Sequence, residues 1–458
     1  MYVSFSTNLL YHEKVSQTFK ERIRGFVLKK IKLLLMGLII LTCLFFAYFV
    51  TYTFVEPKAY DFMISHVLTE KVPFDKNKQT YGSDDVVLVV IDKKTIEKYR
   101  WPWRRDLYCK IYEYFKKYAK PDVILHDTLI ASLDIENPDA DSKFFASIDK
   151  MDNLVMGFMP NVVGWENTDF GKKYDEMFTK YAVNSINKIT LPSYGYWSFL
   201  PFPKPYFNVV KHCGSVSMIP GFIDGNVSSY AMDEIIRNHE YIIRYQDKIY
   251  PSVAMEGFLI KNNNPQMVVS NSHIYFPELN YKIKQKSTIY QSIVPLRFYK
   301  LNDQGYTHKK YSAVDILDSY DAITSGKKPI INPEIFKNKI VIFGANVPAG
   351  SGLNDNKNTP IISHHPGVDI QATATDNILH NDFLKIVPKF LNILLMILGM
   401  TLIYILIRVN DLFKSIALSI GLIGGYFLFA AMCYYFKIVT FVITPPVMFV
   451  ITMLIGYT

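Results

Sequence analysis

The sequence predicts an α/β fold with a largely parallel or mixed sheet, together with four transmembrane helices, one near the N-terminus and three near the C-terminus. Two observations lead to this prediction: long uncharged apolar runs at both ends of the 458 residues, and a strand–helix–strand pattern between them. An apolar content of 50% with only 20% charged residues is also high for a purely soluble protein. We therefore expect part of the chain to lie in lipid.

The first predicted span is the run 33–55, which contains 23 residues and no formal charge. About 20 apolar residues are enough to cross a bilayer core as a helix. A cleaved signal peptide is the alternative, but its apolar stretch would be shorter and followed by small residues, whereas this run continues through Phe49 and Phe54. We interpret it as an uncleaved anchor.

Three further apolar runs close the chain, at 390–407, 415–436 and 438–457. Gly421 and Gly425 form a small-residue strip in the second of them, and such strips let two helices approach closely. A homodimer through the transmembrane helices is one interpretation, and ordinary glycine usage in membrane helices is the other. Pro445 and Pro446 are expected to kink the last span because proline removes backbone donors.

The net charge of +9 is concentrated at the N-terminus, where residues 1–32 hold seven Lys or Arg against two Glu. Cationic residues beside a span are retained in the cytoplasm. The basic tail 1–32 is therefore predicted to be cytoplasmic and the segment 56–388 extracytoplasmic. Lys437 lies between the last two spans, on the predicted extracytoplasmic side, and is the one cation beside these spans that does not follow the rule. With the remaining charge nearly balanced, no nucleic-acid partner is expected.

The middle segment opens with a β-branched run, 86–91, which is typical of a strand buried on both faces. A helical pattern at 107–118 and a second strand at 122–126 follow, and this order predicts a right-handed parallel crossover. Further strands are predicted at 153–159, 241–245, 267–269, 273–276 and 339–343, and further helices at 252–260, 313–319 and 368–379.

Candidate ligand-binding residues gather after the first strand, where Trp101, Trp103, Arg104 and Arg105 precede a helix. Ligands of open α/β sheets lie near such strand-to-helix junctions, and arginine with helix N-terminal amides can hold an anion. The alternative is structural: the tryptophans fill the sheet edge, and Arg104 or Arg105 pairs with the strand-end carboxylates. Those carboxylates, Asp92 and Asp127, complete the candidate set.

Catalytic, metal and disulfide chemistry is not expected in this chain. Five aspartates could suggest a metal site, but they are better explained as residues that end strands and cap helices. No phosphate-binding loop, dinucleotide fingerprint, nucleophile elbow or zinc-protease motif occurs, so we predict no catalytic residue and no cofactor. Cys43 and Cys433 lie in apolar runs, and Cys109 and Cys213 are interpreted as free thiols. The aspartates are Asp92, Asp127, Asp139, Asp141 and Asp355.

Several segments follow one another in a recognisable order: 86–92, 101–105, 121–127, Asp139 with Asp141, 233–237, 250–252, 337–344, Asp355, 359–360 and 366–372. In this order they resemble the CHASE domain of the second type, an extracellular sensory domain associated with cyclases and histidine kinases. The resemblance covers nearly the whole middle segment. Glu234 departs from it, since the family tends to have glycine after the aspartate at that place.

The resemblance implies a receptor in the bacterial inner membrane that binds an unknown extracytoplasmic ligand and contacts membrane lipid. Such chains usually continue into a cytoplasmic output domain, for which an adenylate or guanylate cyclase is the first expectation and a diguanylate cyclase or kinase the next. We accordingly expect output sequence after Thr458. The alternative is an accessory membrane subunit with no enzymatic output.

Overall fold

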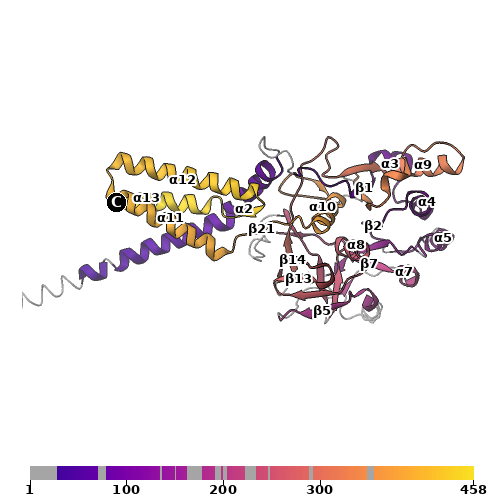
Figure 1. Cartoon of the computed structure of the whole chain (residues 1–458), viewed down its shortest axis with the longest axis horizontal. Helices are drawn as coiled ribbons and strands as arrows, with labels where there is room; N and C mark the ends of the chain where they lie inside the picture. Colours follow the sequence, from indigo (N-terminus) through magenta and orange to yellow (C-terminus); the bar gives the residue numbers. More distant parts are fainter. Residues whose placement is uncertain are drawn as a thin grey trace, which may run out of the picture. The chain divides into compact units, whose positions relative to one another are not determined.

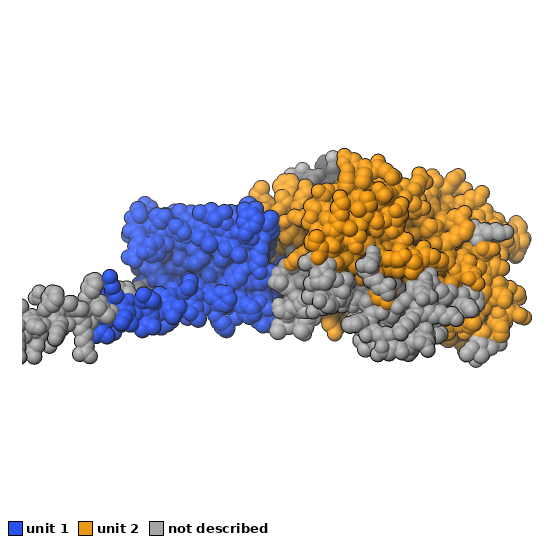
Figure 2. Space-filling model, turned by 90° about the horizontal axis from the view of Figure 1, so that it is seen from below, with its two compact units in different colours: residues 1–60, 387–430, 440–458 blue, residues 61–386, 431–439 orange. Residues whose placement is uncertain are grey.

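A computed structural model describes residues 28–32, 34–70, 79–130, 132–134, 137–149, 151–161, 178–190, 198–199, 204–221, 234–245, 248–287, 292–347 and 355–457. Most of the predicted basic tail lies outside these ranges. The chain divides into two compact units, coloured separately in Figure 2. Unit 1 comprises residues 1–60, 387–430 and 440–458, and unit 2 comprises 61–386 and 431–439.

Unit 2 is built on a six-stranded sheet in which every neighbouring pair is parallel, in the order β17-β1-β18-β2-β3-β7. The parallel sheet of the prediction is therefore confirmed. All six residues of β1 are buried, as its unbroken β-branched sequence requires. The strands are β1 (Val86–Ile91), β2 (Val123–His126), β3 (Leu154–Phe158), β7 (His212–Ser215), β17 (Lys309–Ser312) and β18 (Ile340–Ala345).

Helices cover both faces of this sheet (Figure 1). Alternate residues of β1 explain the division: Val87 and Val89 pack with α4, α5 and α9, whereas Val86 and Leu88 pack with α8 and α10. The helices are α3 (Lys93–Lys98), α4 (Arg105–Tyr114), α5 (Pro138–Ile148), α7 (Lys204–Val209), α8 (Val253–Lys261), α9 (Ala313–Thr324) and α10 (Gly367–His380).

Short, mostly antiparallel sheets complete unit 2. One has the order β14-β13-β12-β5, another β15-β16-β9-β8, and β10 pairs with β11. Their strands are β5 (Ser185–Lys188), β8 (Ile219–Pro220), β9 (Ile236–His239), β10 (Ile242–Tyr245), β11 (Lys248–Pro251), β12 (Met267–Ser270), β13 (His273–Phe276), β14 (Tyr281–Lys284), β15 (Lys286–Ser287) and β16 (Ser292–Pro295). Two-stranded pairs are formed by β4 (Pro160–Asn161) with β6 (Ser198–Phe199), and by β19 (Asn356–Lys357) with β20 (His365–Pro366).

Unit 1 consists of apolar helices. Among the residues that the structure describes, three helices are long and apolar enough to cross a membrane: Leu28–Leu68, which includes α2 (Glu56–Met63), α11 (Lys389–Val409) and α12 (Leu412–Tyr435). The fourth predicted span is shorter than expected, because α13 begins at Thr444 and ends at Tyr457. Its 14 residues span about 21 Å at 1.5 Å per residue. The structure therefore supports three of the four predicted spans by length.

Pro445 and Pro446 lie in the first turn of α13, so the expected kink in the last span is wrong. Proline is tolerated in a first turn because those N–H groups have no partner within the helix. The free N–H groups around this helix start are satisfied instead by Glu56, whose carboxylate accepts from the backbone N–H of Thr444 at 2.9 Å and from its hydroxyl at 2.7 Å. Glu56 is fully buried and acts as the cap of α13.

Gly214 of β7 allows the sheet to approach the start of α8. A Cβ atom at this position would lie 2.5 Å from the backbone nitrogen of Val253, which has little freedom to move. We expect Gly214→Ala to lower the free energy of unfolding by about 1–3 kcal/mol, the usual cost of overpacking. Chemical denaturation followed by fluorescence measures this difference.

Gly257→Ala is the matched comparison, because a Cβ there meets the flexible side chain of Leu125 at 2.9 Å. Alanine is also favoured over glycine within a helix by about 0.5–1 kcal/mol. Gly257→Ala should therefore destabilise less than Gly214→Ala. Equal losses of unfolding free energy in the two variants would show that the close backbone contact at Gly214 does not determine the cost of the substitution.

Candidate functional site

The tryptophan and arginine residues predicted as ligand contacts lie at the start of α4, beside the carboxyl end of β2. Trp103 is 4% exposed and packs in the core, with its ring centroid 5.4 Å from that of Tyr108. Trp101 is partly buried against the same cluster. Both tryptophans therefore pack in the core cluster that covers one face of the sheet.

The two arginines have carboxylate partners of their own. Arg104 Nη2 lies 3.1 Å from Asp106 Oδ2 in an exposed pair. Arg105 Nε lies 3.1 Å from Asp141 Oδ1 in a largely buried pair, and Arg105 also donates to the carbonyl of Ser132 at 2.7 Å. The structural alternative expected Asp92 or Asp127 as the partner. The arginines do pair with carboxylates, but these belong to Asp106 and Asp141.

Asp92 and Asp127 lie in different surroundings at the carboxyl edge of the sheet. Asp92 caps α3 by accepting from the backbone N–H of Thr95 at 3.1 Å, and it also accepts from Ser312 Oγ at 2.7 Å and pairs with Lys310. Burial raises the pKa of Asp127 well above its usual value, and the nearby carboxylate of Asp355 adds to this rise. Ligand contact by the six residues stays a prediction.

Near this junction, three buried polar atoms have no hydrogen-bond partner of normal geometry among the described residues: Trp103 Nε1, His126 Nε2 and Thr128 Oγ1. Burial lowers the pKa of His126 to about 3, so its ring is neutral at physiological pH. Its other nitrogen, Nδ1, contacts the hydroxyl of Tyr112. The junction thus contains unsatisfied polar groups in an aromatic setting.

A second polar site, which the sequence did not predict, runs along the buried side of α10. Its centre is His308, whose ring lies between two carboxylates of that helix. His308 Nε2 lies 3.3 Å from Asp376 Oδ2, and Nδ1 lies 3.5 Å from Asp369 Oδ1. All three side chains have no exposed surface, so this is an ion cluster without water to screen it.

Each carboxylate of the α10 cluster has further donors. Asp369 accepts from Thr307 N at 2.7 Å, from Thr307 Oγ1 at 2.8 Å, and pairs with His365 Nε2 at 2.7 Å. Asp376 accepts from Ser83 N at 2.9 Å and from Ser83 Oγ at 2.6 Å. The many donors offset the cost of burying two negative charges.

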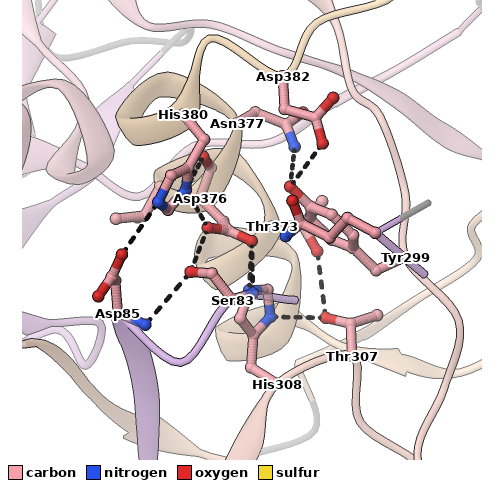
Figure 3. Close-up of polar contacts among 12 residues, drawn as sticks. Ser83, Asp85, Tyr299, Thr307, His308, Thr373, Asp376, Asn377, His380 and Asp382 are labelled. Atoms are coloured by element: carbon pink, nitrogen blue, oxygen red, sulfur yellow. Dashed lines mark hydrogen bonds and ion pairs between the residues drawn. The ribbon is translucent and has the colours of Figure 1, made fainter. Parts of the chain in front are cut away.

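Figure 3 shows the outer end of this cluster, where His380 lies between Asp376 and Asp85. His380 Nδ1 lies 2.7 Å from Asp376 Oδ1, and Nε2 lies 3.0 Å from Asp85 Oδ2. Within the described ranges, no group of three or more histidine, cysteine or acidic side chains has the arrangement needed to hold a metal ion. The contacts of the cluster are ion pairs and hydrogen bonds, and they join α10 to the segment that leads into β1.

The carboxylates set the charge state of the histidines. Burial alone would lower the pKa of His308, but its hydrogen bonds to Asp369 and Asp376 outweigh that effect and raise it to about 9. The hydrogen bond to Asp376 likewise raises the pKa of His380 to about 9. In turn, burial would raise the pKa values of both carboxyl groups, yet the histidines hold them well below their usual range.

A chain of contacts continues from the cluster to the turn between α12 and α13. Asn377, next to Asp376, donates to the carbonyl of Arg297 at 3.0 Å and to the hydroxyl of Tyr299 at 3.2 Å. Tyr299 donates to Asp382 Oδ2 at 3.3 Å, and Asp382 also lies within ion-pair distance of Arg297. Figure 3 shows Asn377, Tyr299 and Asp382 together beside α10.

Asp382 also binds Lys437, the cation that ran against the charge rule. Beside this pair, β21 (Lys385–Ile386) and β22 (Ile438–Val439) form a short parallel ladder, and Lys385 N donates to the carbonyl of Lys437 at 2.8 Å. Segment 431–439 is thereby held within unit 2. The buried carboxylate of Asp382 thus balances the charge of Lys437.

A helical spacing of polar residues is the signal that could have pointed to this cluster. His365, Asp369, Thr373, Asp376 and His380 recur every three or four residues just before and along α10, most of whose other positions are apolar or small. Every residue from Gly367 to Ile378 is buried. Polar residues in a fully buried helix require polar partners. Those partners, Ser83 and His308, could not be identified because they are distant in sequence.

The raised pKa values of His308 and His380 predict how stability changes with pH. A group whose pKa is higher in the folded than in the unfolded state contributes fully below the unfolded value of about 6.5. This contribution is lost as the pH rises through about 9. We therefore expect the urea midpoint of the full chain to fall between about pH 6.5 and about pH 9.5.

His380→Asn should make this fall shallower, because it removes one of the two histidines. His364→Asn is the control: its side chain is exposed, and asparagine suits its positive φ of 63°. A midpoint that stayed constant or rose over this pH range would contradict the charge states assigned to the cluster.

Comparison with known proteins places the chain in a family. The profile of the CHASE2 domain matches residues 36–406, which is most of the chain. Comparisons with curated proteins and with solved structures give no significant match. CHASE2 is a sensory extracellular domain of signalling proteins. The parallel sheet, the buried cluster on α10 and the apolar helices described above are therefore those of a protein that belongs to the CHASE2 family.

Proposed function

We propose that this chain is the sensory and membrane portion of a bacterial transmembrane receptor. In this proposal unit 2 lies outside the cytoplasm and detects a signal, and the helices of unit 1 carry the response through the inner membrane. The cytoplasmic output proposed is an adenylate or guanylate cyclase. The family match supports the sensory role, and the three long apolar helices support membrane attachment.

The observation that carries the proposal is the assignment of segment 431–439 to unit 2, although it lies between two helices of unit 1 in sequence. The chain passes between the units at residues 60–61, 386–387, 430–431 and 439–440. A rearrangement of unit 2 therefore reaches the ends of several helices through covalent bonds. A binding protein that was merely anchored to the membrane would need only one such connection.

Strong polar contacts within unit 2 lie close to these crossings. Asp61, the first residue of unit 2, forms a two-oxygen pair with the guanidinium of Arg237 at 2.6–2.7 Å. Arg237 is fully buried, on β9. Asp382 and Lys437 form the corresponding pair near the later crossings. Such paired charges resist separation in a buried site, so displacements within unit 2 are passed on to the chain at these points.

A ligand would act by binding one arrangement of unit 2 more tightly than another. The helices would then follow the favoured arrangement. A homodimer is part of the proposal, since signal transfer through single helices commonly uses a partner copy. Gly421, Gly424 and Gly425 of α12 support the homodimer, because they leave room for the close approach of a second helix. Apart from α12 itself, no described atom lies within 4 Å of a Cβ atom built on any of the three.

Membrane orientation is the direct test. In a chain whose four cysteines are replaced by alanine, Ser325→Cys places a thiol on the exposed end of α9, and Ser16→Cys places one in the basic tail. A membrane-impermeant maleimide applied to intact spheroplasts should label the Ser325→Cys chain. It should label the Ser16→Cys chain only after the membrane is permeabilised.

The opposite labelling pattern would place unit 2 in the cytoplasm and exclude the proposed receptor orientation. The cysteine-free chain is the control for labelling of other nucleophiles. Because both thiols are on the same polypeptide background, expression and insertion can be compared directly between the two variants.

A further inference from the structure

A small cavity of about 210 Å³ lies in unit 2, near the amino end of β7. It is distinct from both the junction at α4 and the cluster on α10, because it shares no lining residue with either. Three segments that are distant in sequence, 180–184, 211–212 and 256–267, form its walls. The lining residues are Lys180, Tyr181, Ala182, Val183, Asn184, Lys211, His212, Glu256, Leu259, Asn264, Pro265 and Met267.

Lys180 provides a positive charge without a countercharge among the described residues. Its ammonium donates to the backbone carbonyls of Phe207 and Val210, the latter at 3.2 Å, at the end of α7. It also lies 4.6 Å from the ring centroid of Tyr181. An ammonium has three donors, so one remains for a bound molecule. Burial lowers the pKa of Lys180, and an anion nearby would relieve that cost.

Glu256 is the one carboxylate among the lining residues that the structure describes, and it already has a partner. Its Oε1 lies 2.7 Å from Nδ1 of His212, and the two side chains are 10% and 22% exposed. Lys211, the second lining lysine, pairs with Asp152, which is largely exposed and lies outside the cavity lining. Exposed pairs of this kind contribute little and exchange readily. The cavity therefore has an excess of positive charge.

The size and the walls restrict the occupant further. Drug-sized ligands occupy pockets of about 300–1,000 Å³, so this cavity fits only a compact metabolite. Leu259, Pro265 and Met267 supply the apolar part of the lining. Asn184 and Asn264 add neutral hydrogen-bonding groups. A short carbon skeleton with an anionic end matches this combination of walls.

We propose that this cavity binds a small carboxylate-bearing metabolite, with the carboxylate held by Lys180 and Lys211. Rotatable ammonium groups suit an anion of this size. This site rests on the proposed function, for which it supplies the chemical class of the signal. No covalent step is involved, and the molecule is released unchanged.

The position of Glu256 connects the cavity to the cluster on α10. Glu256 and Leu259 are on α8, which packs directly against α10 on one face of the sheet. A carboxylate that binds beside Glu256 repels it and draws the lysines inward, so α8 must adjust. Because cores are close-packed, an adjustment of α8 is passed to α10 and thence to Asp382 and Lys437.

Calorimetric titration of the full chain in nanodiscs tests the site, with acetate, lactate, succinate and glutamate as probes and inorganic phosphate as a separate arm. We expect at least one carboxylate to bind saturably. Lys180→Met should weaken that binding by about tenfold to a hundredfold, the value of one charge-assisted hydrogen bond. Glu256→Gln should strengthen it, because a like charge is removed without a change of shape.

Lys188→Met is the matched control, since Lys188 is an exposed lysine of β5 outside the lining. It should bind the probe as the unmodified chain does. If Lys180→Met fails to fold, Lys211→Met gives the same test at the second lysine of the lining. Absence of carboxylate binding, binding of phosphate alone, or an unchanged affinity in both lysine variants would overturn the proposal. None of these outcomes depends on membrane orientation, so the receptor proposal would fail separately, in the labelling experiment.

Discussion

A protonated histidine held between two buried carboxylates is the interaction on which the organisation of unit 2 depends. His308, Asp369 and Asp376 have no exposed surface, and each would be costly to bury alone. His308 and His380, whose pKa values are both raised, supply the positive charges that balance the two carboxylates, and Ser83 and Thr307 donate hydrogen bonds to the carboxylate oxygens. The cluster forms only when three parts of unit 2 come together: α10, the residues just before β17, and the segment that leads into β1. A cluster of this kind fixes one packing of α10 rather than adding much net stability.

This constraint explains why α10 can be both fully buried and polar. One side of the helix packs on the sheet through Val368 and Ala372, and other side chains carry the cluster. From there, Asn377 and Tyr299 lead to Asp382, which holds Lys437. Unit 2 therefore holds the turn between α12 and α13 through Asp382, which lies two residues after the helix that carries the buried ions.

The sequence predicted the local features of this fold well because they depend on neighbouring residues. The unbroken apolar run of β1 and the patterns of α4, α8 and α10 place these elements within a few residues of their observed ends. The last span was predicted too long, because apolar residues at 438–443 continue the hydrophobic run without being helical. The proline pair marked the helix start there, and Glu56, far away in sequence, provides the cap.

The site was harder to predict because it depends on partners far apart in the chain. Asp92 caps α3, as the strand-end position of Asp92 and Asp127 suggested, but its ion-pair partner Lys310 is 218 residues away in sequence. Arg105 pairs with Asp141 rather than with Asp92 or Asp127. Ser83 and Asp376 are 293 residues apart, and no local pattern connects them. Periodicity can indicate that α10 needs buried polar partners, but not which residues supply them.

Hydrogen exchange in Asp376→Asn, compared with the unmodified chain, tests the central claim most directly. Loss of the central carboxylate charge should loosen α10 and, through Asp382, the ladder between β21 and β22, so amides in segment 431–439 should exchange faster. Amides of β1 and β18 in the middle of the sheet should remain protected. Unchanged exchange in segment 431–439, in a variant whose α10 amides do exchange faster, would contradict the account.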